Sequence, residues 1–139
     1  MPYRWLQFVI VSTTFSGVLV HSVDAQSTNG VTVLNCAVDR KLDSQRNYPQ
    51  SHLDRYKPSV IVRMSGSGAM LSRCSVSPSS GAETCDDYSV DRVDHEENVG
   101  ITKFYVTDSH FDVQVFSDLS FVENNGRGTI SFGQCVKAQ

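Results

Sequence analysis

Short runs of alternating apolar and polar residues recur along the chain from residue 31 onward. The run at 59–65, SVIVRMS, has the period of two that a half-buried strand requires. Further runs rich in β-branched or apolar residues are candidate strands: 31–38, 69–76, 85–93, 99–107, 111–122 and 129–136. Turn residues separate them, and no amphipathic helical period of useful length is present. The pattern predicts an all-β, antiparallel protein.

The stretch NNGRG at 124–128 is either a functional loop or the turn of a hairpin. If Asn125 and Gly126 form a two-residue type I′ turn, Phe121 faces Ile130 and the other large apolar residues of that face also meet one another. A slip of one residue would spoil this match. The stretch therefore predicts mainly a hairpin turn, with Gly128 available for a bulge or a close backbone approach.

The preceding hairpin is predicted to turn at Asp108 and Ser109, which places Val106 opposite Phe111. The last third of the chain then forms an antiparallel meander with one continuous apolar face. Its reverse face is only partly polar, so we expect cover on both sides. This predicts a β-sandwich or a small barrel, with the strand that contains Cys36 lying over the meander.

The first 25 residues have the layout of a secretory signal peptide, with Arg4, an apolar stretch to about Val20 and cleavage after Ala25. Polar residues interrupt the apolar stretch, which falls short of the roughly 20 residues that span a bilayer. The predicted mature chain, 26–139, has the length of one domain. We therefore expect a secreted protein without a membrane segment.

All four cysteines lie in the predicted mature chain: Cys36, Cys74, Cys85 and Cys135. Export favours oxidation, so two disulfides are expected, for which three pairings are possible. We favour Cys36–Cys135, which ties the first strand to the last, and Cys74–Cys85, which closes a short loop. The cysteines and histidines lack the spacing of a zinc site.

The formal net charge of −3 gives no general attraction to nucleic acid or anionic lipid. The acidic run at 86–97 fits a solvated edge strand better than a calcium site. No nucleophile elbow, metalloprotease helix or P-loop motif is present. We expect no metal, no cofactor and a monomer.

A polar segment, 39–58, separates two predicted strands and is a candidate for recognition, because long excursions in compact domains are often functional. Tyrosine and arginine are enriched in binding hot spots. The candidate binding residues are therefore Arg46, Tyr48, His52, Arg55 and Tyr56. Alternatively, the tyrosines only pack the segment down.

An enzymatic alternative is a hydrolase of the small secreted fungal ribonuclease type, which uses histidine, glutamate and arginine with a helping tyrosine. The chain offers these residue types at Tyr48, His52, His110, Glu123 and Arg127. Their spacing departs from that family, and the last two flank a predicted turn, where charges usually face water. An enzyme is therefore the less favoured reading.

The chain resembles small secreted cysteine-containing proteins of plant-associated fungi, rust fungi especially. The resemblance rests on the VDAQ cleavage site, the four spaced cysteines and the strand-rich half that ends FVENNGRGTISFGQC. It implies an effector, an exported virulence protein that binds a host protein and suppresses defence, outside host cells or after uptake into them. It supplies no catalytic residues. A structural protein of the cell surface is a further alternative.

Overall fold

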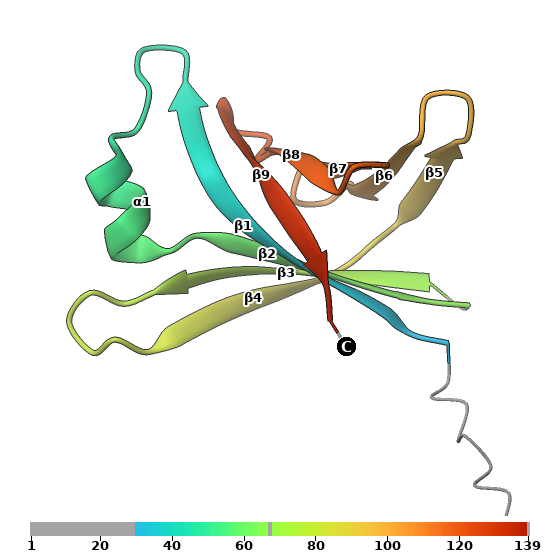
Figure 1. Ribbon diagram of the computed structural model, residues 1–139, viewed down its shortest axis with the longest axis horizontal. Coiled ribbons are helices and arrows are strands. Elements are labelled where there is room, and N and C mark those ends of the chain that lie inside the picture. The colour runs from blue at the N-terminus through green and yellow to red at the C-terminus, as the bar shows by residue number, and fades with distance from the viewer. Residues whose placement is uncertain (1–29, 67, 139) are drawn as a thin grey trace, which may run out of the picture.

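The computed structural model describes residues 30–66 and 68–138 (Figure 1). The predicted signal peptide, 1–25, lies outside these residues. The described residues form nine strands and one short helix, α1 (Gln50–Tyr56). The strands are β1 (Thr32–Asp43), β2 (Ser59–Ser65), β3 (Gly68–Val76), β4 (Glu83–Ser89), β5 (Arg92–Glu96), β6 (Ile101–Val106), β7 (Phe111–Phe116), β8 (Ser120–Asn124) and β9 (Thr129–Lys137).

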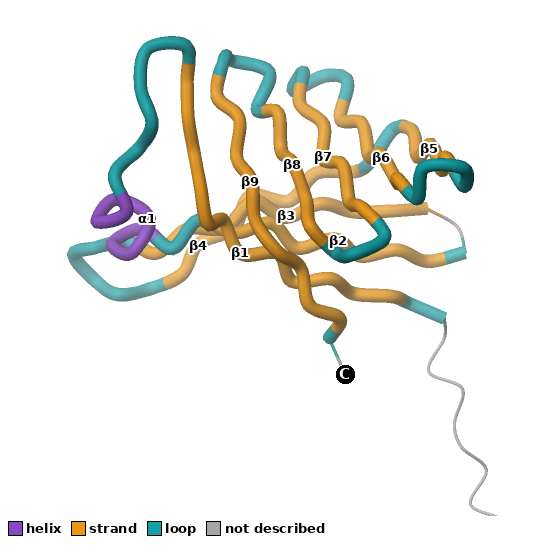
Figure 2. Tube along the Cα trace, turned by 45° about the horizontal axis from the view of Figure 1, so that its top comes forward, coloured by secondary structure: helices purple, strands orange, loops and turns teal. Residues whose placement is uncertain are grey.

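The nine strands form one antiparallel sheet in the order β4-β3-β2-β1-β9-β8-β7-β6-β5. The sheet consists of two meanders, β1–β4 and β5–β9, joined by the pairing of β1 with β9. It curls so that the two meanders face each other, as a half-barrel (Figures 1 and 2). The predicted all-β, antiparallel class is confirmed. The Cys36 strand, however, lies beside the last strand in the same sheet and does not lie over it.

Alternation of apolar residues fixes the inner face of the curl. Along β1, for example, Leu34, Cys36 and Val38 are buried, whereas Asn35, Ala37 and Asp39 are exposed. The two meanders meet through such residues, since the ring of Tyr88 on β4 packs edge-on against Phe111 on β7 with centroids 4.8 Å apart. The helix α1 adds Leu53 to this core. Within 30–66 and 68–138, no helix is long and apolar enough to cross a membrane.

Only Val90 and Asp91 separate β4 from β5, the two outermost strands of the sheet. The Val90 N–H donates to the carbonyl of Ala69 on β3, and the Asp91 N–H donates to that of Tyr105 on β6, at 3.1 and 2.9 Å. The Asp91 carboxylate also accepts a bond of 2.6 Å from the Thr107 N–H. This two-residue link therefore holds the edges of the half-barrel together at one point.

Both disulfides form as predicted, each between directly paired residues of neighbouring strands. Cys36 on β1 is bonded to Cys135 on β9, across 99 residues of sequence. Cys74 on β3 is bonded to Cys85 on β4, across 11 residues. Loop-closure entropy assigns the long crosslink roughly 4–5 kcal/mol of stabilisation and the short one somewhat less than about 3 kcal/mol.

Several predicted boundaries are wrong. The predicted strand 111–122 is two strands, β7 and β8, because residues 117–119 form a tight turn. The predicted strand 85–93 divides in the same way into β4 and β5, and the predicted turn at 94–98 is partly strand. At the other end, β1 runs on to Asp43, so the polar excursion begins at Ser44 and not at residue 39.

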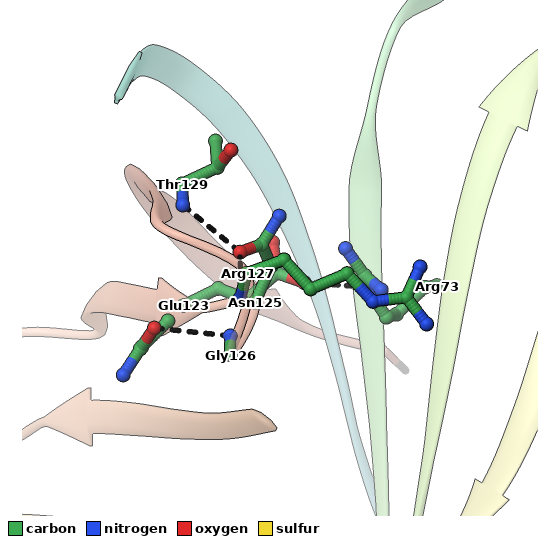
Figure 3. A network of polar contacts seen from close by, with 7 residues as sticks. Arg73, Glu123, Asn125, Gly126, Arg127 and Thr129 are labelled. Atoms are coloured by element: carbon green, nitrogen blue, oxygen red, sulfur yellow. Dashed lines mark hydrogen bonds and ion pairs between the residues drawn. The ribbon is translucent and has the colours of Figure 1, made fainter. Parts of the chain in front are cut away.

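The register around NNGRG is also wrong. Phe121 pairs with Gly133, not with Ile130, so the hairpin is shifted by three positions from the predicted type I′ arrangement. The connection is longer because the Asn125 side-chain carbonyl accepts hydrogen bonds from the N–H groups of Arg127 and Thr129, at 2.8 and 2.9 Å (Figure 3). The stretch is nevertheless a hairpin turn.

The Asp108–Ser109 register is confirmed, with Val106 opposite Phe111.

The close backbone approach expected at Gly128 occurs instead at Gly126. Gly126 has φ 68°, and a Cβ there would lie 1.7 Å from the carbonyl oxygen of His110. Gly128 has φ 84° but no atom within 4 Å of its Cβ position. The 125–128 turn therefore packs on the neighbouring 107–110 turn, and only Gly126 is required by that contact.

These two glycines give a matched test of loop packing. Gly128→Ala should destabilise the protein by about 1–2 kcal/mol, the usual cost of a side chain at positive φ. Gly126→Ala should cost about 2–4 kcal/mol, because overpacking adds to the same backbone term. Urea denaturation of the two variants measures both values. Equal losses would contradict the packing of Gly126 against His110.

Candidate functional site

The predicted recognition segment is held firmly where it leaves the sheet. The last residues of β1 pair with β9 beyond a bulge between Val38 and Arg40. The Asp43 carboxylate then accepts hydrogen bonds from the N–H groups of Gln45 and Arg46, at 2.9 and 3.0 Å. These bonds fix the direction of the chain into the loop, as an Asx turn does.

The helix α1 holds the second part of the segment. Leu53 is 4% exposed and anchors the helix in the hydrophobic core. Lys57 caps the end of the helix, with φ 42° and its N–H donating to the Leu53 carbonyl at 2.7 Å. His52 and Tyr56 are four residues apart, so both project from the same side of the helix.

Three rings of the segment form a continuous row. The ring of Tyr48 lies 5.1 Å from that of His52, and His52 lies 4.6 Å from Tyr56, measured between centroids. All three side chains are half-buried. The sequence interpretation that the tyrosines pack the segment down and the interpretation that they form a binding surface are therefore compatible.

Cations lie over the row at both of its ends. At the Tyr48 ring, the Arg46 guanidinium is 4.9 Å and the Lys41 ammonium 5.4 Å from the centroid. At the Tyr56 ring, the Arg55 guanidinium is 5.6 Å from the centroid. The structure thus brings all five predicted binding residues together and adds Lys41. We call the six the aromatic–basic surface: Lys41, Arg46, Tyr48, His52, Arg55 and Tyr56.

Lys41 also lines a polar cavity of about 250 Å³ next to this surface. Its wall includes Pro58 from the end of the recognition segment and inner-face residues of both meanders. Four charged side chains contribute to it: Lys41, Arg73, Asp86 and Glu123. The aromatic–basic surface and this polar cavity are therefore continuous.

An ion pair spans the cavity from one meander to the other. Glu123 on β8 is 4% exposed, and its Oε1 lies 2.5 Å from the Nε of Arg73 on β3 (Figure 3). The pair lies outside directed hydrogen-bond geometry, so the attraction is mainly ionic. The Arg73 guanidinium also lies 5.2 Å from the centroid of Phe111. The prediction that Glu123 faces water beside a turn is wrong.

The histidines predicted for a hydrolase do not meet this glutamate. His52 belongs to the ring row, the Nδ1 of His95 lies 2.8 Å from the Thr102 hydroxyl oxygen, and His110 is in the 107–110 turn. None of the three lines the cavity that contains Glu123. A site in which histidine, glutamate and arginine converge is therefore not formed there.

Sequence reasoning missed Lys41 and Arg73. Lys41 lies in a polar stretch that showed no strand pattern, so its position opposite Ser131 on β9 was not evident. Arg73 lies next to Cys74 in a strand whose inner and outer faces could be distinguished only by register. Leu71 and Arg73 are two residues apart and so lie on the same face of the strand. This spacing was the available signal that Arg73 points to the inner face.

The ion pair predicts an asymmetry between two substitutions. Arg73→Met should destabilise the protein by about 3 kcal/mol, because it leaves the buried Glu123 carboxylate without a partner. Glu123→Gln should cost only about 1 kcal/mol, since Arg73 is 32% exposed and can turn towards water. Urea denaturation at pH 7 measures both. Equal effects would contradict a buried, partner-dependent carboxylate.

Acid should lower the stability of the protein by protonating Asp43 at the start of the recognition segment. The N–H of Gln45, followed by the N–H and charge of Arg46, holds the pKa of Asp43 below its ordinary value. The carboxylate therefore stabilises the fold above its unfolded pKa of about 3.9, and this contribution disappears as the pH falls through the lower folded pKa.

Asp43→Asn should accordingly be less stable than the wild type at pH 7, and the difference should shrink below about pH 4. Thermal unfolding at pH 7 and pH 3 measures it. Asp108→Asn, at an exposed turn position, is the matched control and should show no such difference. A gap between wild type and Asp43→Asn that stays constant with pH would contradict the prediction.

Comparison with protein-family models, with curated proteins and with solved structures finds no match to this chain. The function must therefore be argued from the aromatic–basic surface and the cavity beside it.

Proposed function

We propose that the protein is a secreted effector-type binding protein that attaches to a host protein through the aromatic–basic surface and has no catalytic role. The observation that carries the proposal is the row of Tyr48, His52 and Tyr56 with a cation over each end. Tyrosine and arginine at the centre of an interface supply a large share of binding free energy.

The surface is organised before any partner arrives. Leu53 anchors the helix, and the hydrogen bonds of Asp43 direct the chain at the start of the loop. Side chains that are already ordered lose less conformational entropy on binding. Arg46 and Arg55 are exposed, so their guanidinium groups are accessible to carboxylates of a partner.

The charge of the segment favours an acidic partner surface. Residues 40–57 contain five basic and two acidic side chains, a net charge of +3, whereas the whole chain carries −3. Such a local excess steers association with an oppositely charged patch and raises the association rate. We therefore propose a host protein with an acidic surface as the partner.

Two disulfides support action in an oxidising compartment, as a secreted protein would have. The proposed binding to a host protein would suppress host defence, outside the host cell or after uptake. The alternatives are a secreted ribonuclease and a structural surface protein. The separation of the histidines from Glu123 gives no support to the first, and no observation favours the second.

The test is capture of a partner from host extract with the mature protein, followed by affinity measurement with that purified partner. Arg46→Ala combined with Arg55→Ala should weaken binding about 30-fold or more, the effect of losing a hot spot, while the thermal midpoint holds.

The matched control uses another cation–aromatic cluster. On β5 and β6, Arg92 and Lys103 lie 4.1 and 5.7 Å from the Tyr105 centroid. Arg92→Ala combined with Lys103→Ala should leave the affinity unchanged. Equal weakening by both double variants would contradict the proposed surface, and RNA cleavage by the wild type would favour the ribonuclease instead.

A further inference from the structure

A second cavity, of about 260 Å³, opens on the inner side of the sheet and is chemically different from the polar one. It is lined by residues from the start of β1 and the end of β2, whereas the polar cavity is lined by the opposite ends of both strands. Its floor consists of buried apolar side chains, Leu34, Phe104 and Val115. It is an apolar pocket inside a curled sheet, the usual setting for a small ligand.

Its walls combine an adaptable side chain with a strained one. Met64, which packs against the core, can adjust to the shape of a ligand. Leu119 has φ 65° in the tight turn between β7 and β8, a conformation that glycine or asparagine adopts with less strain. A bulky side chain retained under backbone strain beside a pocket points to a role for that side chain in the pocket.

One charged side chain among the described residues lines this cavity, and it is basic. Lys137 at the end of β9 lines it and forms no ion pair with any described residue. His95 also lines it, and its Nδ1 is held at 2.8 Å by the hydroxyl oxygen of Thr102, which fixes the ring. Within 30–66 and 68–138, no aspartate or glutamate lines the cavity. An apolar interior with cationic and polar groups at its edge suits a ligand with an apolar body and an anionic head.

We propose that this cavity binds a small monocarboxylic acid with an aliphatic or aromatic body. The body would pack on Leu34, Phe104 and Val115, and the carboxylate would pair with Lys137 next to His95. The volume lies just below the range of about 300–1,000 Å³ that is typical of ligand pockets, which indicates a ligand smaller than most drugs. The polar cavity, lined by Lys41, Arg73, Asp86 and Glu123, offers little apolar surface for the body of such a ligand.

Octanoate is a suitable probe, and octanol is its uncharged counterpart. Isothermal titration calorimetry of the oxidised mature protein should show saturable binding of one octanoate, with weaker binding of octanol. Lys137→Gln should lower the affinity for octanoate about three- to fivefold, as expected for one exposed ion pair, and leave octanol binding unchanged. Lys57→Gln, at an exposed lysine at the end of α1, is the control and should change neither affinity.

Leu119→Gly tests the wall separately from folding. Glycine suits φ 65°, so relief of backbone strain should offset part of the core packing lost with the Leu119 side chain and the protein should still unfold cooperatively, while the affinity for both probes should fall at least threefold. Met64→Trp should fill the cavity and abolish binding of both.

Three results would each overturn the proposal: absence of saturable octanoate binding, equal octanoate affinity of wild type and Lys137→Gln, or full affinity in Leu119→Gly. None of these residues belongs to the aromatic–basic surface, so the outcome is independent of the proposed function.

Discussion

The pairing of β1 with β9 is the constraint on which the rest of the structure depends. It joins the first strand to the last and so turns two separate meanders into one sheet. At its centre the Cys36–Cys135 bond is almost completely buried. Next to it, Gly133 lets the strands approach closely, since a Cβ there would lie 1.8 Å from the Ala37 carbonyl oxygen and 2.7 Å from the Phe121 ring. The curl of the sheet, its inner face and both cavities follow from this junction.

The inner face created by the curl has two different ends. Near the ends of β1 and β2 that carry the recognition segment, charged residues line the cavity and one ion pair links the meanders. Near the other ends of the same strands, the cavity has an apolar floor and one charged residue, Lys137, in its described lining. A core that includes Val60, Val62 and Phe121 lies between them. Protein contacts and small-molecule binding are therefore proposed for separate parts of one scaffold.

The parts of the fold that short sequence patterns determine could be predicted. The run at 59–65 is a strand with the predicted bounds, and the Asp108–Ser109 turn sets the predicted register. Both cysteine pairings were also predicted. The turn at 117–119 was not, because it contains neither glycine nor proline. The Asp118 carboxylate stabilises it by accepting bonds from the N–H and hydroxyl of Ser120, and these bonds hold Leu119 at positive φ.

The errors at the site come from the NNGRG connection. Its register was deduced from a two-residue Asn-Gly turn and the matching of apolar residues, and Glu123 was placed beside a turn in water, whereas the Asn125 side chain stabilises a longer connection. The observed register puts Glu123 opposite Ser131 on the inner face. The recognition residues were easier to find, because a cluster of tyrosine and arginine is visible without knowledge of register. Lys41 could not be predicted as part of this surface, because it joins the surface only through the continuation of β1 to Asp43.

The separation of β1 from β9 along the chain has a consequence for folding. Contacts within each meander are local and can form early, whereas the pairing between the meanders must wait for loop closure over almost the whole described chain. During synthesis the first meander therefore has an unpaired β1 edge until β9 has emerged. Such an edge readily accepts a strand from another molecule. Efficient production of the protein should therefore depend on chaperone and oxidase activity that protects this edge until the two halves meet.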